Sequence, residues 1–352
     1  MAKNYKIRME YLKQLRDMFE SFVDDPMVAR DYLRLDLLIE RLEHDFQQTA
    51  DNDGIVDQLG EDYKHWADFR KYVPKLKRFF NGGLYFSEAV SPKFKEIKVS
   101  DEDTVMLARE FFSKQGEFFV KHFDNFLEDE AEDHIDFFDP SKHSSGEMMY
   151  LHTTGDKFIF AANYSNIVKP TAFVHEAQHV IDNEANPEFF ENNVIRETAA
   201  VFMELLATDY FNNFFGLDNQ NLLRQFQILS IIKMDTRDAL YRDRMIKIYK
   251  KIKDYKPDHI YKRLTKRINT DYADFMADYS IYQLYNYQIP YLTAIELYTL
   301  YQVDKDKALN ILIDIILNGT PKNIFTLLAK HGISLNKHSH QYEEELCLKL
   351  GI

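Results

Sequence analysis

Large apolar side chains recur every three or four positions over the first part of the chain. Between residues 4 and 48 they are Tyr11, Leu12, Leu15, Met18, Phe19 and Phe22, followed by Tyr32, Leu35, Leu37, Leu38 and Leu42. This spacing places the apolar residues on one face of a helix, and the interruption "DDP" at 24–26 would break the pattern into two helices. The pattern therefore predicts a helical hairpin, with further helix from about 56 to 80.

The centre of the sequence changes from a helical to a strand-like pattern. Residues 100–130 predict one long helix, with Ser100 as its N-cap and Asp103 at the capping-box position. Residues 136–170 lose the helical period, and "KFIFAANYS" at 157–165 is the best strand candidate. A small sheet is therefore expected in an otherwise helical chain.

Helical spacing returns after "KPT". The patterns predict one helix that begins at Thr171 and a second from about Val194 to Phe214, ended by Gly216. From about 219 to 328 the chain again has the pattern of nearly continuous helix, with breaks near Pro257, Pro290, Gly319 and Pro321. We place a domain boundary near residue 95, which gives an N-terminal helical region (1–95) and a second domain (96–352).

Composition supports a mainly α fold and narrows the function. The 352 residues include only 11 Gly and 9 Pro, too few for a fold with many tight turns. The net charge is −13 with no basic block, which argues against a nucleic-acid partner. Cys347 is the only cysteine, and no apolar run reaches the ~18 residues that a membrane span needs. We expect a cytoplasmic protein without a membrane partner; the oligomeric state is not predicted.

The stretch "TAFVHEAQHVID", residues 171–182, carries the strongest chemical signal. On a helix, His175 and His179 share one face and can direct both imidazoles at a single metal ion. Glu176 beside them can take a proton from a water at that ion, as in zinc hydrolases. The alternative is a surface helix with a solvated pair of histidines. The apolar neighbours Phe173 and Val180 favour a buried helix instead.

A third ligand is available on the second predicted helix, in "VIRETAAVFMELLATDY". Glu197 follows His179 after 17 intervening residues, enough for the chain to turn and bring the two helices side by side. Glu204 lies two turns further along the same face. Its carboxylate can hydrogen-bond the second nitrogen of a ligand histidine and fix the orientation of that ring.

Three segments together resemble the zinc oligopeptidases of the oligoendopeptidase F and thimet oligopeptidase type. "FVHEAQHVID" is similar to the zinc helix of that family, and "RETAAVFMELL" is similar to its second helix. "YQLYNYQIPYLTAIELYTLY", followed by "ALNILIDIILNGTPKNIFTLLAKHGISL", is similar to its tyrosine-rich segment and closing helices. The likeness extends from about 95 to 336, and residues 1–95 resemble a shortened N-terminal region.

The resemblance implies a helical zinc-peptidase domain with a small sheet beside the active-site helix. It implies one zinc ion per chain on His175, His179 and Glu197, with Glu176 as general base and Glu204 behind the ligands. Tyr287 would steady the oxyanion, and Tyr285 and Tyr279 are further candidates for oxyanion or substrate contacts; a packed interhelical ring is the alternative for Tyr287. The strand at 157–165 would offer its edge to an extended oligopeptide substrate.

The chain departs from the family at three positions. Gln178 replaces a usual glycine, Asp182 stands where a histidine is common, and Ala277 falls near an expected histidine. We therefore expect a zinc metalloendopeptidase that cleaves short peptides. Two alternatives stay open: a degenerate relative that binds zinc or peptides without cleaving them, and an interaction scaffold that holds no metal.

Overall fold

The computed structural model of the chain describes several helices and one small sheet. The described residues are 2–47, 96–128, 134–138, 146–151, 154–162, 168–187, 193–217, 246–256, 259–260, 290, 293–320 and 323–333.

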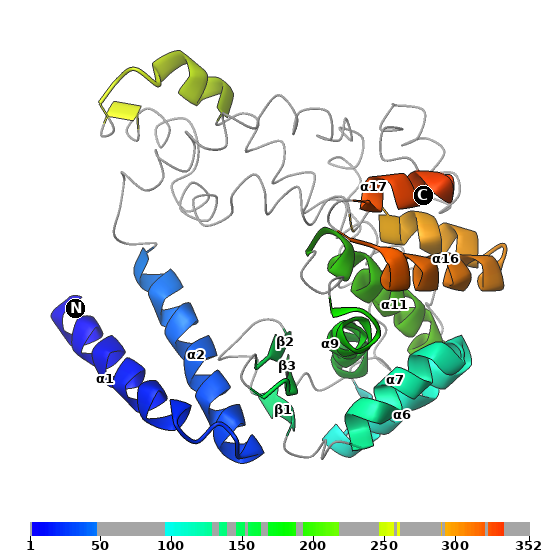
Figure 1. The fold of residues 1–352 in the computed structure, drawn as a ribbon, viewed down its shortest axis with the longest axis horizontal. Helices are drawn as coiled ribbons and strands as arrows, with labels where there is room; N and C mark the ends of the chain where they lie inside the picture. Colours follow the sequence, from blue (N-terminus) through cyan, green and yellow to red (C-terminus); the bar gives the residue numbers. More distant parts are fainter. Residues whose placement is uncertain are drawn as a thin grey trace.

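Helices dominate these residues, and three strands form one small sheet (Figure 1). The labelled helices are α1 (Ala2–Glu20), α2 (Pro26–Gln47), α6 (Asp101–Gln115), α7 (Glu117–Glu128), α9 (Val168–Ala185), α11 (Asn193–Phe214), α16 (Lys305–Asn318) and α17 (Ile324–Lys330). Residues 246–252 and 293–301 are also helical. The strands are β1 (Ile135–Phe138), β2 (Glu147–Tyr150) and β3 (Lys157–Ala162). The predicted fold class, mainly α with a small sheet beside the helix that carries the histidines, is confirmed.

The N-terminal hairpin forms as the apolar spacing predicts. Pro26 is the first residue of α2, where its missing N–H is no loss because first-turn amides have no partner within the helix. The Asp25 carboxylate accepts a hydrogen bond from the backbone N–H of Met27 at 2.9 Å and so caps α2. α1 ends at Glu20, residues 21–25 form a turn, and α2 starts at Pro26.

The long helix predicted for residues 100–130 is wrong in one respect: it is two helices. Gly116 separates α6 from α7 with a φ of 131°, a conformation that glycine adopts readily and other residues do not. The predicted cap is confirmed, since the Ser100 hydroxyl accepts from the N–H of Asp103 at 3.1 Å. It also donates to the Asp103 carboxylate at 2.6 Å.

The sheet has the strand order β1-β3-β2, so β3 is its central strand. β3 pairs in parallel with β1 and antiparallel with β2. The strand predicted near residues 157–165 is confirmed, but the expectation that this strand offers a free edge to a peptide is wrong. Both of its edges are already hydrogen-bonded, and β1 and β2 are the outer strands of the described sheet.

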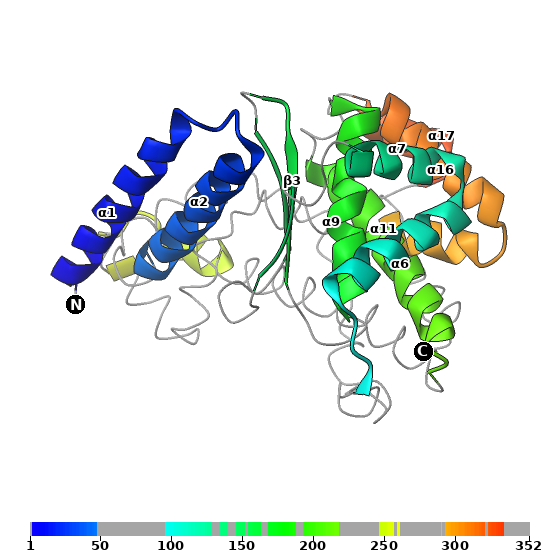
Figure 2. The same cartoon turned by 90° about the horizontal axis from the view of Figure 1, so that it is seen from below.

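The two faces of the sheet pack against different helices, because successive side chains of a strand point to opposite sides. Ile159 and Ala161 join the main core, which α6, α7, α9, α11 and α16 share. Phe158 and Phe160 pack with Leu33 of α2 on the opposite face. Figure 2 shows the resulting order of layers: the α1–α2 hairpin, the sheet, α9 and then α11.

An ion pair reinforces the contact between the hairpin and the sheet. The Arg34 guanidinium on α2 donates two hydrogen bonds of 2.6 Å to the Asp136 carboxylate on β1. The described part of the N-terminal region thus packs directly on the sheet. The division at residue 95 stays a prediction, since residues 48–95 lie outside the described part.

α9 begins at Val168, three residues earlier than the predicted start at Thr171. Pro170 is compatible with this start because it falls in the first turn, where its fixed φ suits a helix. Phe173, Val174, Ala177, Val180 and Ile181 are fully buried, so α9 lies in the interior between the sheet and α11.

The predicted second helix is confirmed as α11, followed by Gly216 with a φ of 60°.

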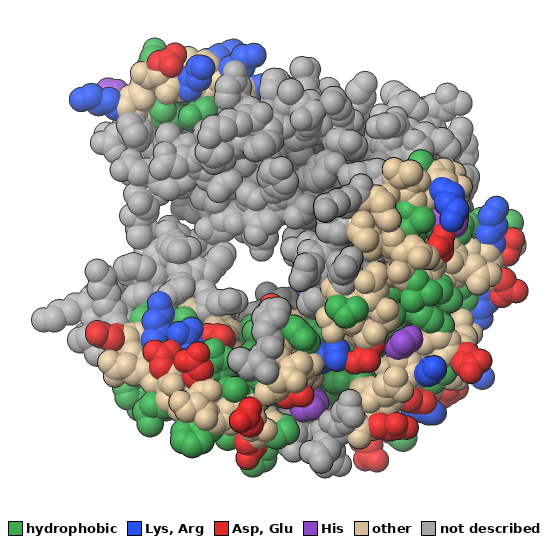
Figure 3. Space-filling view, in the orientation of Figure 1, with side chains coloured by type: hydrophobic (Ala, Val, Ile, Leu, Met, Phe, Trp, Pro, Cys, Tyr) green, Lys and Arg blue, Asp and Glu red, His purple; other side chains and the backbone are tan. Residues whose placement is uncertain are grey.

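On the face drawn in Figure 3, acidic and basic side chains are interspersed over the described surface. Within the described ranges, no helix combines the length and the apolar character needed to cross a lipid bilayer.

Candidate metal centre

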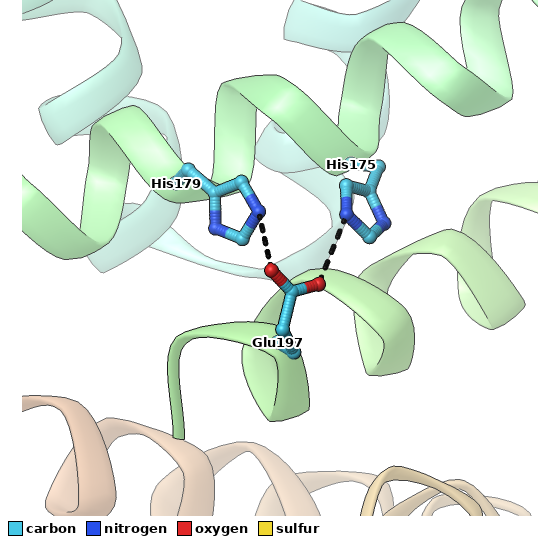
Figure 4. Close-up of side chains that lie close together, drawn as sticks. All are labelled: His175, His179 and Glu197. Carbon is cyan, nitrogen blue, oxygen red and sulfur yellow. Dashed lines mark ion pairs between the residues drawn. The ribbon is translucent and has the colours of Figure 1, made fainter. Parts of the chain in front are cut away.

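His175 and His179 lie one turn apart on α9 and face the same side (Figure 4). Their ring centroids are 5.0 Å apart and the ring planes are perpendicular. His179 is 4% exposed, and the His175 side chain is 19% exposed. The predicted helix is therefore buried, and the alternative of a solvated pair of histidines does not describe it.

Glu197 on α11 completes the group. Its Oε2 lies 3.5 Å from Nε2 of His175, and its Oε1 lies 3.7 Å from Nε2 of His179. One donor atom from each of the three residues can be chosen so that all lie within 4.8 Å of one another. Glu197 is 7% exposed, so its carboxylate is committed to this site rather than to solvent.

The three donor groups fit zinc. Two imidazole nitrogens and a carboxylate oxygen are preferred zinc ligands, and ligands about 2.1 Å from one tetrahedral ion lie about 3.4 Å from one another. Oε2 of Glu197 lies 3.5 Å from Nε2 of His175 and Oε1 lies 3.7 Å from Nε2 of His179, so each oxygen–nitrogen separation is close to that value. The three groups could therefore hold a metal ion.

Glu204 contacts Nδ1 of His175 and so fixes the orientation of the imidazole ring. Its Oε2 is 3.1 Å from Nδ1 of His175, on the opposite side of the ring from the Nε2 that faces Glu197. A carboxylate at Nδ1 holds the proton on that nitrogen and leaves Nε2 free to bind a metal. Glu204 thus contacts the ring nitrogen of His175 that points away from Glu197.

The carboxylates dominate the electrostatics of His175. Burial alone would lower the pKa of this imidazole, but Glu197 and Glu204 together raise it well above its ordinary value of 6.5. Burial would raise the pKa of Glu197, yet the two histidines and Arg196 lower it to about 2. Without metal, the ionised Glu197 therefore favours a protonated His175.

His179 behaves in the opposite way. Burial lowers its pKa well below the ordinary value, so the ring stays neutral. Its Nδ1 is buried and makes no hydrogen bond to any described residue. A neutral imidazole is the form that binds a metal.

Glu176 adjoins His175 on α9 and is 7% exposed. Burial is the main reason that its pKa rises to about 7, with further contributions from the negative charges of Glu197 and Glu147. A carboxyl group with a pKa near neutrality can both accept and release a proton at physiological pH. The structure thus places Glu176 beside the ligand group in a protonation range suited to acid–base chemistry.

Gln178 and Asp182, two of the departures from the family, contact each other. Both are fully buried, and Nε2 of Gln178 donates to Oδ1 of Asp182 at 2.7 Å. Burial raises the pKa of Asp182 well above its ordinary value, in spite of this hydrogen bond. The sequence shows their i, i+4 spacing, but only the fold shows that both are in the interior.

Several predicted residues cannot be compared with the structure. Tyr287, Tyr285 and Tyr279, together with the departure at Ala277, lie outside the described residues. Sequence reasoning also missed a neighbour of Glu176. A Cβ atom added to Gly146 would lie 2.8 Å from the Glu176 side chain. The two residues are far apart in the chain, so no local pattern signals this contact.

No protein-family model and no curated protein sequence matches the chain. A structure provisionally named a peptidase from Chlamydophila abortus matches with a TM-score of 0.54 and 16% identity, over 98% of this chain and 63% of that one. A provisionally named oligoendopeptidase F from Bacillus anthracis strain Ames matches with a TM-score of 0.51 and 11% identity, over 94% and 63% of the two chains. PZ peptidase A, solved with an inhibitor, matches with a TM-score of 0.51 and 14% identity, over 98% and 66%.

These similarities concern the fold. The chain has an oligoendopeptidase F-like fold, as the three sequence segments predict, and it spans about two thirds of the length of the structures that it matches.

Proposed function

We propose that the chain is a zinc metallopeptidase that hydrolyses peptide bonds in short peptides. The observation that carries this proposal is the convergence of His175, His179 and Glu197 within 4.8 Å, with the buried carboxyl group of Glu176 beside them. The fold shared with structures named as peptidases supports the same conclusion.

His175, His179 and Glu197 would hold one zinc ion. Zinc, when bound, supplies a Lewis acid that polarises the substrate carbonyl and makes water more acidic. The two Nε2 atoms and the carboxylate of Glu197 provide three ligands, and a catalytic site of this kind keeps a further position open for solvent or substrate. Glu204 would hold His175 in the orientation that this requires.

Glu176 would act as general base and then as general acid. Its carboxylate takes a proton from the attacking water while the oxygen of that water bonds to the carbonyl carbon. It then passes the proton to the amine nitrogen as the C–N bond breaks. The pKa of about 7 supports both halves of this cycle, because neither protonation state is strongly favoured near neutral pH. From the resemblance, the phenol of Tyr287 would donate a hydrogen bond to the developing oxyanion.

Two measurements on one preparation test the function. Elemental analysis of protein purified without added zinc should find about one zinc per chain, the stoichiometry that three ligands and one open position imply. A mixture of quenched fluorescent peptides should be cleaved, and Glu176→Gln should remove that cleavage while zinc is retained. Glu184→Gln is the matched control, since Glu184 lies on the same helix but pairs with Lys157 instead.

The outcomes separate the alternatives. Zinc without cleavage would indicate a degenerate relative, and the lack of any metal would indicate a scaffold. Cleavage that Glu176→Gln leaves at full rate would remove this residue from the mechanism. A cytoplasmic location stays a prediction of the sequence.

A further inference from the structure

Gly146 lies directly before β2, at the point where the chain passes the side chain of Glu176. An ideal Cβ built on Gly146 would lie 2.8 Å from Cγ, 2.9 Å from Oε1 and 3.1 Å from Cδ of Glu176. Distances below 3.0 Å essentially never occur between a real Cβ and a heavy atom outside its own residue and the two chain neighbours. The three nearest atoms all belong to Glu176, so this one side chain occupies the space that a residue other than glycine would need.

Backbone conformation does not explain the glycine. Gly146 lies outside the left-handed region, unlike Gly155 at the other end of the β2–β3 hairpin, where φ is 85°. A left-handed φ therefore does not require glycine at this position. The atoms that an added Cβ would meet first belong to the Glu176 side chain, which would have to shift.

Packing holds the backbone on both sides of this contact. On the strand side, Met148 is 6% exposed within the main core and pairs with Ile159 of β3, which fixes β2 against α9. On the helix side, Val174 and Ala177 flank Glu176 closely in sequence and are fully buried. An added methyl group in a close-packed interior displaces a neighbouring side chain. Here the side chain that must move is that of Glu176.

We propose that Gly146 is a positioning residue: because it lacks a side chain, the Glu176 carboxyl group can lie where it meets the attacking water beside His175 and His179. This inference rests on the role proposed for Glu176. A shift of about 1 Å in a catalytic group is enough to reduce a rate by roughly 10²-fold. Glycine at 146 therefore contributes to turnover without touching metal or substrate through a side chain.

Gly146→Ala tests the kinetic consequence. We expect kcat to fall by roughly 10²-fold, with KM and zinc content close to those of the wild type, because the substitution displaces the base and leaves the ligands in place. Gly155→Ala is the matched control. It strains the turn of the same hairpin, where the nearest atom to the new Cβ is the Tyr150 hydroxyl at 3.9 Å. It should lower Tm and retain kcat.

A thermodynamic cycle on the metal-free protein tests the contact itself. Gly146→Ala should lower Tm by several degrees in the wild type. In a Glu176→Ala background it should change Tm little, because the three atoms that the new Cβ would meet are no longer present. Equal losses of Tm in both backgrounds would overturn the inference, as would a wild-type kcat for Gly146→Ala or an equal loss of kcat in Gly155→Ala.

Different results would contradict the proposed peptidase function and the positioning role of Gly146. If the wild type cleaves no peptide, the proposed function fails, and the Tm cycle alone decides whether Gly146 sets the position of Glu176. If the wild type is active and the cycle is additive, the function stands and the role of Gly146 does not.

Discussion

Nδ1 of His175 lies 3.1 Å from Oε2 of Glu204, while Nε2 of the same ring lies 3.5 Å from Oε2 of Glu197. One imidazole thus joins two carboxylates from the same helix, α11, on opposite sides of its ring. The Glu204 carboxylate at Nδ1 fixes the orientation of the ring. The Glu197 carboxylate at Nε2 borders the position proposed for the metal. The residues needed to bind a metal and to orient one of its ligands come from a single pair of neighbouring helices.

Glu204→Gln should weaken zinc binding without removing it. The substitution keeps the size of the side chain but takes away the charge that orients His175 and makes its Nε2 a stronger ligand. Loss of such a partner reduces metal affinity by about 10- to 100-fold. Competition for zinc with a chromogenic chelator measures the change, and Glu184→Gln on α9 should bind zinc like the wild type. Equal affinities for Glu204→Gln and the wild type would show that this carboxylate does not act on the metal.

Zinc binding should release protons near neutral pH. The pKa of His175 is raised well above 6.5 in the metal-free chain, so its imidazole carries a proton that a metal at Nε2 must displace. Affinity should therefore fall as the pH is lowered. Calorimetric titrations in buffers with different ionisation enthalpies give the number of protons released, which should be lower in Glu204→Gln. A heat of binding that is independent of the buffer would contradict this prediction.

Glu176→Gln should stabilise the metal-free protein at neutral and higher pH. Folding raises the pKa of Glu176 from 4.5 to about 7, so the folded chain binds this proton more tightly than the unfolded chain. The contribution of Glu176 to the unfolding free energy of the wild type is thus lost as the pH rises from about 4.5 towards 7. Above pH 7 the unfolding free energy stays at the lower level. A shift of that size corresponds to roughly 3 kcal/mol.

The amide of the glutamine variant does not ionise, so its advantage in unfolding free energy should grow with pH over the same interval. Urea unfolding at pH 5 and pH 8 in the presence of a chelator measures it. A difference between wild type and variant that is the same at both pH values would show that Glu176 does not titrate in this interval.

Asp101→Asn should destabilise the protein more than Lys169→Met. Lys169, 2% exposed, donates through Nζ to the Asp101 carboxylate and to the carbonyl oxygen of Val99, and its ammonium lies 4.7 Å from the ring centroid of Phe137. Removal of the carboxylate leaves a buried ammonium without its counter-ion, whereas removal of the lysine leaves Asp101 free to be hydrated, because its side chain is 60% exposed.

Urea unfolding of the two variants gives the comparison between them. We expect Asp101→Asn to lower the unfolding free energy by about 2 kcal/mol or more, and Lys169→Met by less. The reverse order would mean that the ammonium finds adequate partners without Asp101.

The helices named above and the three candidate ligands could be predicted from the sequence because their signals are local. Apolar spacing places α1, α2, α9 and α11, and the i, i+4 spacing of His175 and His179 needs only one helix to become a pair. The position of Glu197 follows once α11 is recognised as the next helix in the chain.

What could not be predicted depends on contacts between distant segments. The pairing of β3 with both β1 and β2 is not encoded in the pattern of β3 itself, so its central position came only from the structure. Gly116 is a possible helix end in the sequence, but the helical apolar spacing continues on both sides of it and favours one unbroken helix. The structure shows that the helix ends there. The contact between Gly146 and Glu176 joins a loop to a helix, and neither segment contains a sign of the other.

The most direct test of the metal centre is a zinc titration of chelator-treated protein, with the initial rate of peptide cleavage as the readout. We expect no cleavage without metal, a linear rise in rate as zinc is added and a sharp break at one zinc per chain, with the break absent in His179→Ala. A rate that does not depend on added zinc would contradict the proposed zinc site.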